Sequence, residues 1–135
     1  MGPTSRFFTL LPCLLLSISC LAQGQTAPDS YWTEVALEEN GCGDVTVRPG
    51  PTDFLRGGAD SLTVTHAGQS YRGNITQDGR FTTIPRDLVF GTTVYTIAIS
   101  GQFAGKGFTS RVSVRVREQG AEGGCSYTVK WTGTP

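Results

Sequence analysis

The segment from Thr92 to Arg117 constrains the fold more than any other part of this 135-residue chain. Its second half alternates strictly, with Val112, Val114 and Val116 on one side and Arg111, Ser113, Arg115 and Arg117 on the other. Its first half alternates in the same way, with Tyr95, Ile97 and Ile99 on one side, and a glycine-rich turn joins the halves. A period of two is typical of a β-strand with one buried and one solvated face. The segment therefore predicts a long antiparallel hairpin with an apolar inner face and a cationic outer face.

The rest of the chain repeats this pattern and predicts an all-β fold. No stretch has apolar residues at the i, i+3, i+4 and i+7 spacing of an amphipathic helix. Further strands are expected at 31–37, in a hairpin over 61–76, from Phe81, at 125–131 and, as a short piece, at 45–47. Such an antiparallel meander of about seven to eight strands predicts a small closed barrel, because closure removes exposed edges. An immunoglobulin-type β-sandwich is the alternative.

Two turns set the expected register of the middle strands. A two-residue loop at 68–69 pairs Val64 with Gly73, since a glycine at the first loop position suits a type II′ turn. A three-residue loop at 77–79 is expected next, because it keeps Phe81 on the apolar face. A two-residue Asp-Gly loop would move that side chain to the other face.

Two connections carry apolar residues although prolines and glycines interrupt them. Residues 48–60 form the longest stretch without a strand pattern, and the pair Phe54 and Leu55 lies near its middle. We expect a loop there, in which this pair either covers one end of the core or forms a tip that binds a partner. Residues 84–91, broken by Pro85, are expected to form a second connection.

The first 24 residues have the features of a secretory signal peptide. A basic residue precedes an apolar run that is too short to span a bilayer, and small residues follow it. Cleavage near Ala22 or Gly24 leaves residues 25–135 as a single β-barrel domain, secreted or periplasmic and without a transmembrane segment. Lipidation at Cys20 is the alternative route of processing.

Cys42 and Cys125 are the two cysteines that the expected domain retains. Two thiols in an exported chain are expected to pair. In a closed barrel with an even number of strands, the end of the first strand lies near the start of the last, and the two cysteines occupy these places. We predict a structural disulfide rather than a redox centre, because no C-x-x-C motif occurs.

His66 is the only histidine, which excludes a multi-histidine metal site, and we expect neither a metal nor another cofactor. No zincin, P-loop or nucleophile-elbow pattern is present, so we assign no catalytic residue and expect a protein that is not an enzyme. A hydrolase that uses His66 is kept as a third hypothesis. His66 is expected to face Tyr71 at a hairpin end, and both join Phe54 and Leu55 as candidate contacts for a ligand or partner.

The outer face of the long hairpin is a candidate surface for anions. Its members are Arg111, Arg115, Arg117 and, on the next strand, Lys130. Aromatic residues are not interleaved with these cations, so we do not expect binding to nucleic acid. We favour a solvated face paired with acids of the first strand, in which Glu34 lies near Lys130. The inner face carries aromatic residues that either fill the barrel, which we favour, or line a site for one small ligand.

Several segments resemble a broad group of uncharacterised secreted bacterial β-meander proteins. They are S-L-T-V-T-H-A-G-Q-S-Y-R-G-N-I-T-Q-D-G-R-F-T-T, T-V-Y-T-I-A-I-S-G-Q-F and C-S-Y-T-V-K-W-T-G-T-P. This resemblance implies a fold but no activity. The architecture is distantly similar to a lipocalin, although the G-x-W motif of the first lipocalin strand is replaced here by Ser30-Tyr31-Trp32. The expected function is a non-enzymatic exported module that binds a partner or an envelope component; a lipocalin-like carrier of a small apolar ligand is the alternative.

Overall fold

The computed structural model describes residues 29–135, all of whose regular elements are β-strands. The nine strands are β1 (Asp29–Asn40), β2 (Gly50–Arg56), β3 (Ser61–His66), β4 (Gln69–Ile75), β5 (Arg80–Thr83), β6 (Arg86–Phe90), β7 (Thr93–Ala104), β8 (Gly107–Glu118) and β9 (Cys125–Thr134). Within this range no helix has the length and apolar character needed to cross a membrane. The expected signal peptide and Cys20 lie outside the described residues.

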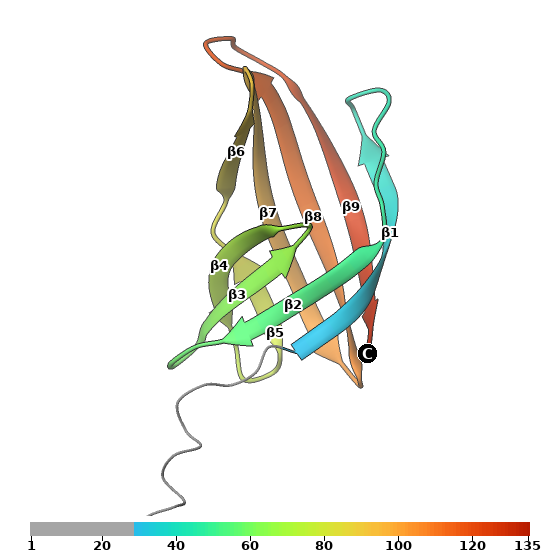
Figure 1. Cartoon of the computed structure of the whole chain (residues 1–135), viewed down its shortest axis with the longest axis vertical. Coiled ribbons are helices and arrows are strands. Elements are labelled where there is room, and N and C mark those ends of the chain that lie inside the picture. Colours follow the sequence, from blue (N-terminus) through green and yellow to red (C-terminus); the bar gives the residue numbers. More distant parts are fainter. Residues whose placement is uncertain (1–28) are drawn as a thin grey trace, which may run out of the picture.

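Eight of the strands close into an antiparallel barrel, and β6 is an extra strand (Figure 1). The order of neighbours is β5-β4-β3-β2-β1-β9-β8-β7-β6, and β5 also pairs with β7. This last pairing, with Phe81 opposite Gly101, closes the ring. The predicted meander and barrel are confirmed, and closure excludes the sandwich alternative.

Two glycines allow β5 to close the ring. A Cβ atom at Gly101 would lie 2.6 Å from the Phe81 ring and 2.5 Å from the Cβ of Ser110. A Cβ atom at Gly73, on β4, would lie 1.9 Å from the carbonyl oxygen of Thr82. Real Cβ atoms do not approach other atoms so closely, so both positions need glycine for the short β5 to fit between β4 and β7.

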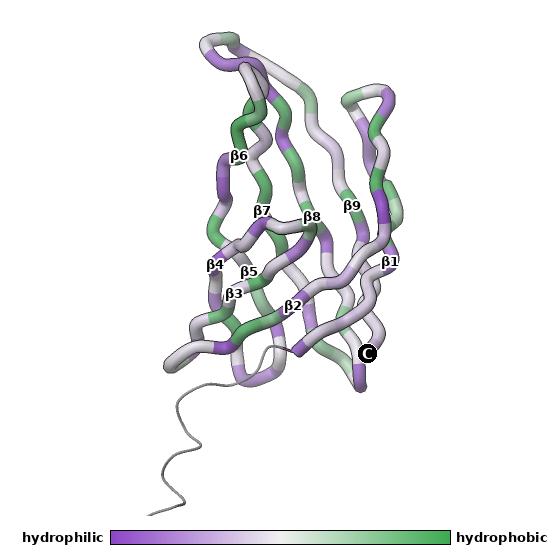
Figure 2. Tube along the Cα trace, viewed as in Figure 1, coloured by the Kyte–Doolittle hydropathy of each residue, from purple (hydrophilic) through white to green (hydrophobic). Residues whose placement is uncertain are grey.

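The long hairpin has the predicted form, with β7 and β8 paired along their whole length from Thr93 opposite Glu118 to Ala104 opposite Gly107. Ile99 faces Val112 and Ile97 faces Val114 on the inner side. Figure 2 shows the alternation of hydrophilic and hydrophobic residues along β8.

The lower half of the barrel, the end that holds the β4–β5 and β7–β8 turns, is filled by aromatic rings. Phe54 lies at the centre, with its ring centroid 4.8 Å from that of Phe108 and 5.2 Å from that of Phe81. Tyr31 and Phe103 complete the cluster, at 5.6 and 4.8 Å from Phe54. Edge-to-face contacts at these distances add to the large apolar area that each ring buries. This cluster is the main core of the protein.

The expectation of a loop over residues 48–60 is wrong, because this segment contains β2. Thr52 and Phe54 face inward and are almost completely buried, whereas Leu55 faces outward and is 44% exposed. Pro51 lies opposite Trp32 of β1 and precedes the first residue that pairs with β3. A proline at the beginning of a strand loses no ladder hydrogen bond, so it obscured the strand pattern without preventing the strand.

Two other local expectations are also wrong. Residues 84–91 are not only a connection, since β6 pairs with β7 and places Leu88 opposite Tyr95. The short strand expected at 45–47 is absent, and Val47 instead packs against the core from a loop. Whether an apolar segment becomes a strand depends on whether a neighbouring strand is available to pair with it. The local sequence pattern does not reveal that neighbour.

The register of the β3–β4 hairpin differs from the prediction by two residues, whereas the next turn is confirmed. The hairpin loop is 67–68, and Val64 lies opposite Tyr71, so the expectation that His66 faces Tyr71 is wrong: His66 lies opposite Gln69. Ala67 and Gly68 have φ values of 51° and 76°, as the two central residues of a type I′ turn require. A shift of two residues leaves every side chain on its predicted face. The three-residue loop 77–79 holds Ile75 opposite Phe81, as expected.

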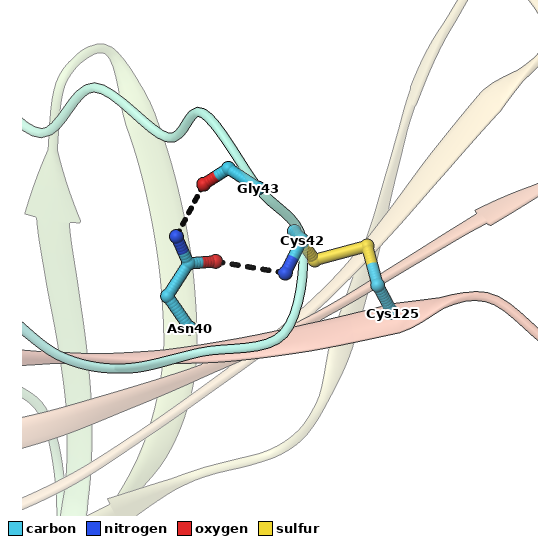
Figure 3. The surroundings of a disulfide bond; sticks show 4 residues. All are labelled: Asn40, Cys42, Gly43 and Cys125. Carbon is cyan, nitrogen blue, oxygen red and sulfur yellow. Dashed lines mark hydrogen bonds between the residues drawn. A yellow bond between two sulfur atoms is a disulfide. The ribbon is translucent and has the colours of Figure 1, made fainter.

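The predicted disulfide between Cys42 and Cys125 is confirmed, with a Cα–Cα distance of 5.1 Å. Figure 3 shows how Asn40 shapes the turn that carries Cys42: its side-chain oxygen accepts a hydrogen bond from the Cys42 amide, at 2.8 Å, and its amide group donates to the carbonyl of Gly43. The disulfide connects the β1–β2 loop to the start of β9. A disulfide is compatible with an extracellular or periplasmic location.

Candidate ligand cavity

The upper half of the barrel, the end that holds the β1–β2 and β8–β9 loops, contains a cavity of about 640 Å³. This volume lies within the range of roughly 300–1,000 Å³ that is typical of small-molecule sites. Six apolar residues supply much of its wall: Val35, Leu88, Ile97, Val114, Val129 and Trp131. The expectation of a filled interior therefore holds for the lower half only.

The cavity follows from the unequal lengths of the strands. Strands β1, β7 and β8 have 12 residues each, whereas β2 to β5 have between four and seven. At about 3.3 Å per residue, the long strands extend well beyond the short ones. In Figure 1 the strands β6 to β9 and β1 continue upward past the β3–β4 hairpin. Their inner face thus extends beyond the short strands in the upper half, where the β1–β2 loop, the β3–β4 hairpin and β6 supply the other residues that line the cavity.

His66 and Trp131 lie at the boundary between the filled and hollow halves. Their ring centroids are 4.3 Å apart, and both side chains line the cavity. Nδ1 of His66 is 2.8 Å from the hydroxyl of Thr52, which is 2.7 Å from the hydroxyl of Thr33. Both threonines are fully buried. These hydrogen bonds fix the imidazole ring and place a polar group at the floor of the cavity.

Burial lowers the pKa of His66 below its usual value of 6.5, and a backbone hydrogen bond at Pro51 opposes this effect in part. Burial disfavours the charged form of an imidazole, so His66 is neutral at pH 7. A neutral imidazole has one donor and one acceptor nitrogen, and its Nδ1 is bonded to Thr52.

Two tyrosines place hydroxyl groups at the cavity wall. Burial raises the pKa of Tyr71 and, for the same reason, the pKa of Tyr127. The Arg86 guanidinium partly offsets this shift at Tyr71 and lies 5.9 Å from the centroid of its ring. Both phenols therefore stay protonated at neutral pH and can donate hydrogen bonds.

Three segments outside the long strands also line the cavity. The β1–β2 loop contributes Val47 and Arg48, the β3–β4 turn contributes Ala67, and β6 contributes Phe90. The ring of Phe90 is 58% exposed and packs edge-on against Tyr95, at 5.7 Å between centroids. An exposed aromatic ring in the lining of a largely apolar cavity offers a first contact for an apolar ligand.

The four residues that sequence reasoning grouped as candidate contacts divide into two sets. His66 and Tyr71 both line the cavity. Phe54 lies in the filled lower half, and Leu55 is on the outer surface. The idea that Phe54 and Leu55 form a binding tip is wrong, because they lie within a strand and face opposite sides of it.

Sequence reasoning missed Arg48 and the β6 residues of the cavity. A signal for β6 was present, since Leu88 and Phe90 alternate with Asp87 and Val89. Nothing in the local sequence distinguishes Arg48, whose role depends on how the disulfide positions the β1–β2 loop.

The cationic outer face is partly paired with acids, as favoured. Arg111 lies 3.3 Å from Glu38 on β1, and Arg117 lies 3.4 Å from Asp87 on β6. Arg115 has Thr96 and Ser126 as its cross-strand neighbours. The expected contact of Glu34 with Lys130 is wrong: Lys130 lies opposite Ala36 and Arg111, and Glu34 accepts a hydrogen bond from Trp32. The register of β1 against β9 places the acid of the first strand at Glu38 instead.

Residues 29–135 contain no group of three or more His, Cys, Asp or Glu side chains that could hold a metal ion. A scan against protein-family models and searches of curated proteins and of solved structures found no match for this chain. The geometry of the chain's own residues is therefore the basis for a functional proposal.

Proposed function

We propose that this protein is an exported binding barrel that carries one small, largely apolar ligand in its upper half. The observation that carries the proposal is the cavity of about 640 Å³ beside a well-packed lower half. Export is supported by the signal-peptide pattern of the first 24 residues and by the Cys42–Cys125 disulfide. The protein would then be secreted or periplasmic.

The division of the interior supports a carrier. The aromatic cluster around Phe54 packs the lower half, and the apolar wall above it lines the cavity. Moving a ligand from water onto this wall is favourable by roughly 25 cal/mol for each Å² of apolar surface that is buried. Val114, Val129 and Ile97 lie on long, fully paired strands, which preorganise the wall.

The geometry gives less support to a hydrolase based on His66. The hydroxyl within hydrogen-bond distance of its ring belongs to Thr52, which is 0% exposed and already bonded to Thr33. A buried hydroxyl cannot attack a substrate that enters the cavity from the mouth. His66 is better suited to accepting or donating one hydrogen bond to a bound ligand.

Titration with a neutral apolar fluorophore, N-phenyl-1-naphthylamine, tests the carrier function. We expect saturable binding of one probe per chain, with energy transfer from Trp131, which lines the cavity. Trp32→Phe serves as the background, because Trp32 is 48% exposed and is the other tryptophan of the two in the chain.

Val114→Phe is the test variant, since its ring would occupy the cavity, and Ser113→Phe, one residue away on the outer face, is the matched control. We expect the first to weaken binding about tenfold or more, as a filled cavity excludes the probe, and the second to leave it unchanged. Circular dichroism checks that both variants fold. Equal binding by the two folded variants, or no saturable binding by the parent, contradicts the proposal.

A further inference from the structure

Three polar side chains of the cavity are gathered on one wall. Arg48, His66 and Gln69 line the cavity where the β1–β2 loop meets the β3–β4 turn, and Arg48 and His66 also border a smaller pocket of about 360 Å³ at this place. The inner faces of β7, β8 and β9 supply mostly apolar side chains, with Tyr127 of β9 as the exception. The cavity therefore has a polar side and an apolar body, as an amphiphilic ligand requires.

The charge on this wall has one sign. Arg48 is charged, and among the described residues that line the cavity none is acidic. Within residues 29–135 Arg48 has no ion pair and no side-chain hydrogen bond, so its five donors are free for a ligand. Arg86, beside the ring of Tyr71, adds a second positive charge near the cavity. Asp53 borders the smaller pocket but faces outward, where it accepts a hydrogen bond from Ser30.

On this basis, which rests on the proposed carrier function, we infer that the ligand is an amphiphile with a carboxylate head bound by Arg48 and an apolar tail against β7, β8 and β9. A guanidinium binds a carboxylate through two parallel hydrogen bonds, and a cleft lined by one sign of charge attracts the opposite charge. Neutral His66 and Gln69 offer further hydrogen bonds to the head group.

A matched pair of probes tests this inference: decanoate and decan-1-ol share a ten-carbon chain and differ in the charge of the head group. Both are titrated below the concentrations at which they aggregate, and the fluorescence of Trp131 in the Trp32→Phe background reports binding. We expect decanoate to bind about tenfold more tightly than decan-1-ol, with a difference that shrinks as salt is added.

Arg48→Gln in the same background removes the charge and keeps much of the side chain. We expect it to reduce decanoate binding about tenfold and to leave decan-1-ol binding unchanged. Arg115→Gln, at an exposed arginine on the outer face of β8, is the control and should alter neither.

Each other outcome has a distinct meaning. If both probes bind the parent equally, or if Arg48→Gln weakens both equally, the carboxylate head is wrong while the carrier function stands. If decan-1-ol binds and decanoate does not, the inferred preference for an anionic head group is wrong. If neither probe nor the neutral fluorophore binds, the proposed function fails as well.

Discussion

The imidazole ring of His66 lies over the indole ring of Trp131, with 4.3 Å between centroids and 36° between planes. This pair joins β3 to β9 across the barrel at the level where packing ends and the cavity begins. A hydrogen bond to Thr52 holds the imidazole from below. The floor of the proposed binding site thus contains a neutral histidine that packs against an aromatic ring.

The first prediction concerns the stability of this floor at mildly acidic pH. Burial lowers the pKa of His66 below 6.5, so the folded state binds a proton more weakly than the unfolded chain does. The stability contributed by the neutral ring is present above the unfolded pKa of about 6.5 and is lost as pH falls from there to the lowered folded pKa. We expect the melting temperature to fall between pH 7.5 and pH 5.5.

His66→Gln supplies the control, because glutamine keeps hydrogen-bonding atoms but does not titrate in this range. Its melting temperature should change less between the two pH values than that of the parent, as differential scanning calorimetry can measure. An equal fall in both proteins would assign the pH dependence to other groups.

The second prediction compares two adjacent residues of β2. Phe54 is 1% exposed at the centre of the aromatic cluster, whereas Leu55 is 44% exposed on the outer face. Phe54→Ala should lower the free energy of unfolding by about 3–5 kcal/mol, as expected for a buried phenylalanine, and Leu55→Ala should change it by less than about 0.5 kcal/mol. Urea denaturation measures both. Similar losses at the two positions would contradict the strand and its orientation.

These two residues also show how far the sequence could predict the fold. The alternation in β7 and β8 is long enough to specify a strand by itself, and the loop 77–79 followed from the need to bury Phe81. Around Phe54 the apolar–polar alternation fails, because Leu55 follows directly and prolines precede, so the strand depends on its pairing with β1 and β3. Local sequence carries no direct record of such long-range pairing.

The cavity was less predictable than the barrel, for a related reason. Parity placed His66 and Tyr71 on the inner face, which the structure confirms. Whether that face is filled or hollow depends on the relative lengths of β2 to β5 and of β7 to β9, and hence on boundaries that the sequence marks poorly. Arg48 faces the cavity through a loop whose path the disulfide restrains. A charged residue in an irregular loop belongs to no periodic sequence pattern, so its orientation cannot be predicted from parity.

The third prediction concerns this disulfide, which spans 83 residues of sequence. In the chain-entropy model, closing a loop of this length stabilises the folded state by up to about 4–5 kcal/mol. Replacement of Cys42 and Cys125 together by serine should therefore lower the free energy of unfolding by up to this amount. It should also weaken probe binding in the protein that remains folded, because Val47 and Arg48 lie on the loop that the bond restrains.

Chemical denaturation and fluorophore titration measure these two effects separately. Reduction of the parent with dithiothreitol should reproduce both and should have no effect on the double serine variant. Unchanged affinity in a folded double variant would show that the β1–β2 loop keeps its place without the bond.

The fourth prediction concerns the closure of the barrel at Gly101. An added Cβ would lie 2.6 Å from the Phe81 ring on β5 and 2.5 Å from both the Cβ of Ser110 and the carbonyl oxygen of Thr109 on β8, so Gly101→Ala must shift β5, the ring or β8. Forcing extra atoms into a packed core typically costs about 1–3 kcal/mol. Gly58→Ala is the control, because a Cβ there would meet nothing within 4 Å. Thermal unfolding should show a lower melting temperature for Gly101→Ala only.

The double variant Gly101→Ala with Phe81→Leu locates the clash, because leucine shortens the opposing side chain. If it restores part of the lost stability, the clash lies at the β5–β7 contact that closes the ring. Additive losses would place the clash at Ser110 and Thr109 of β8 instead and leave the role of Phe81 in closure unsupported.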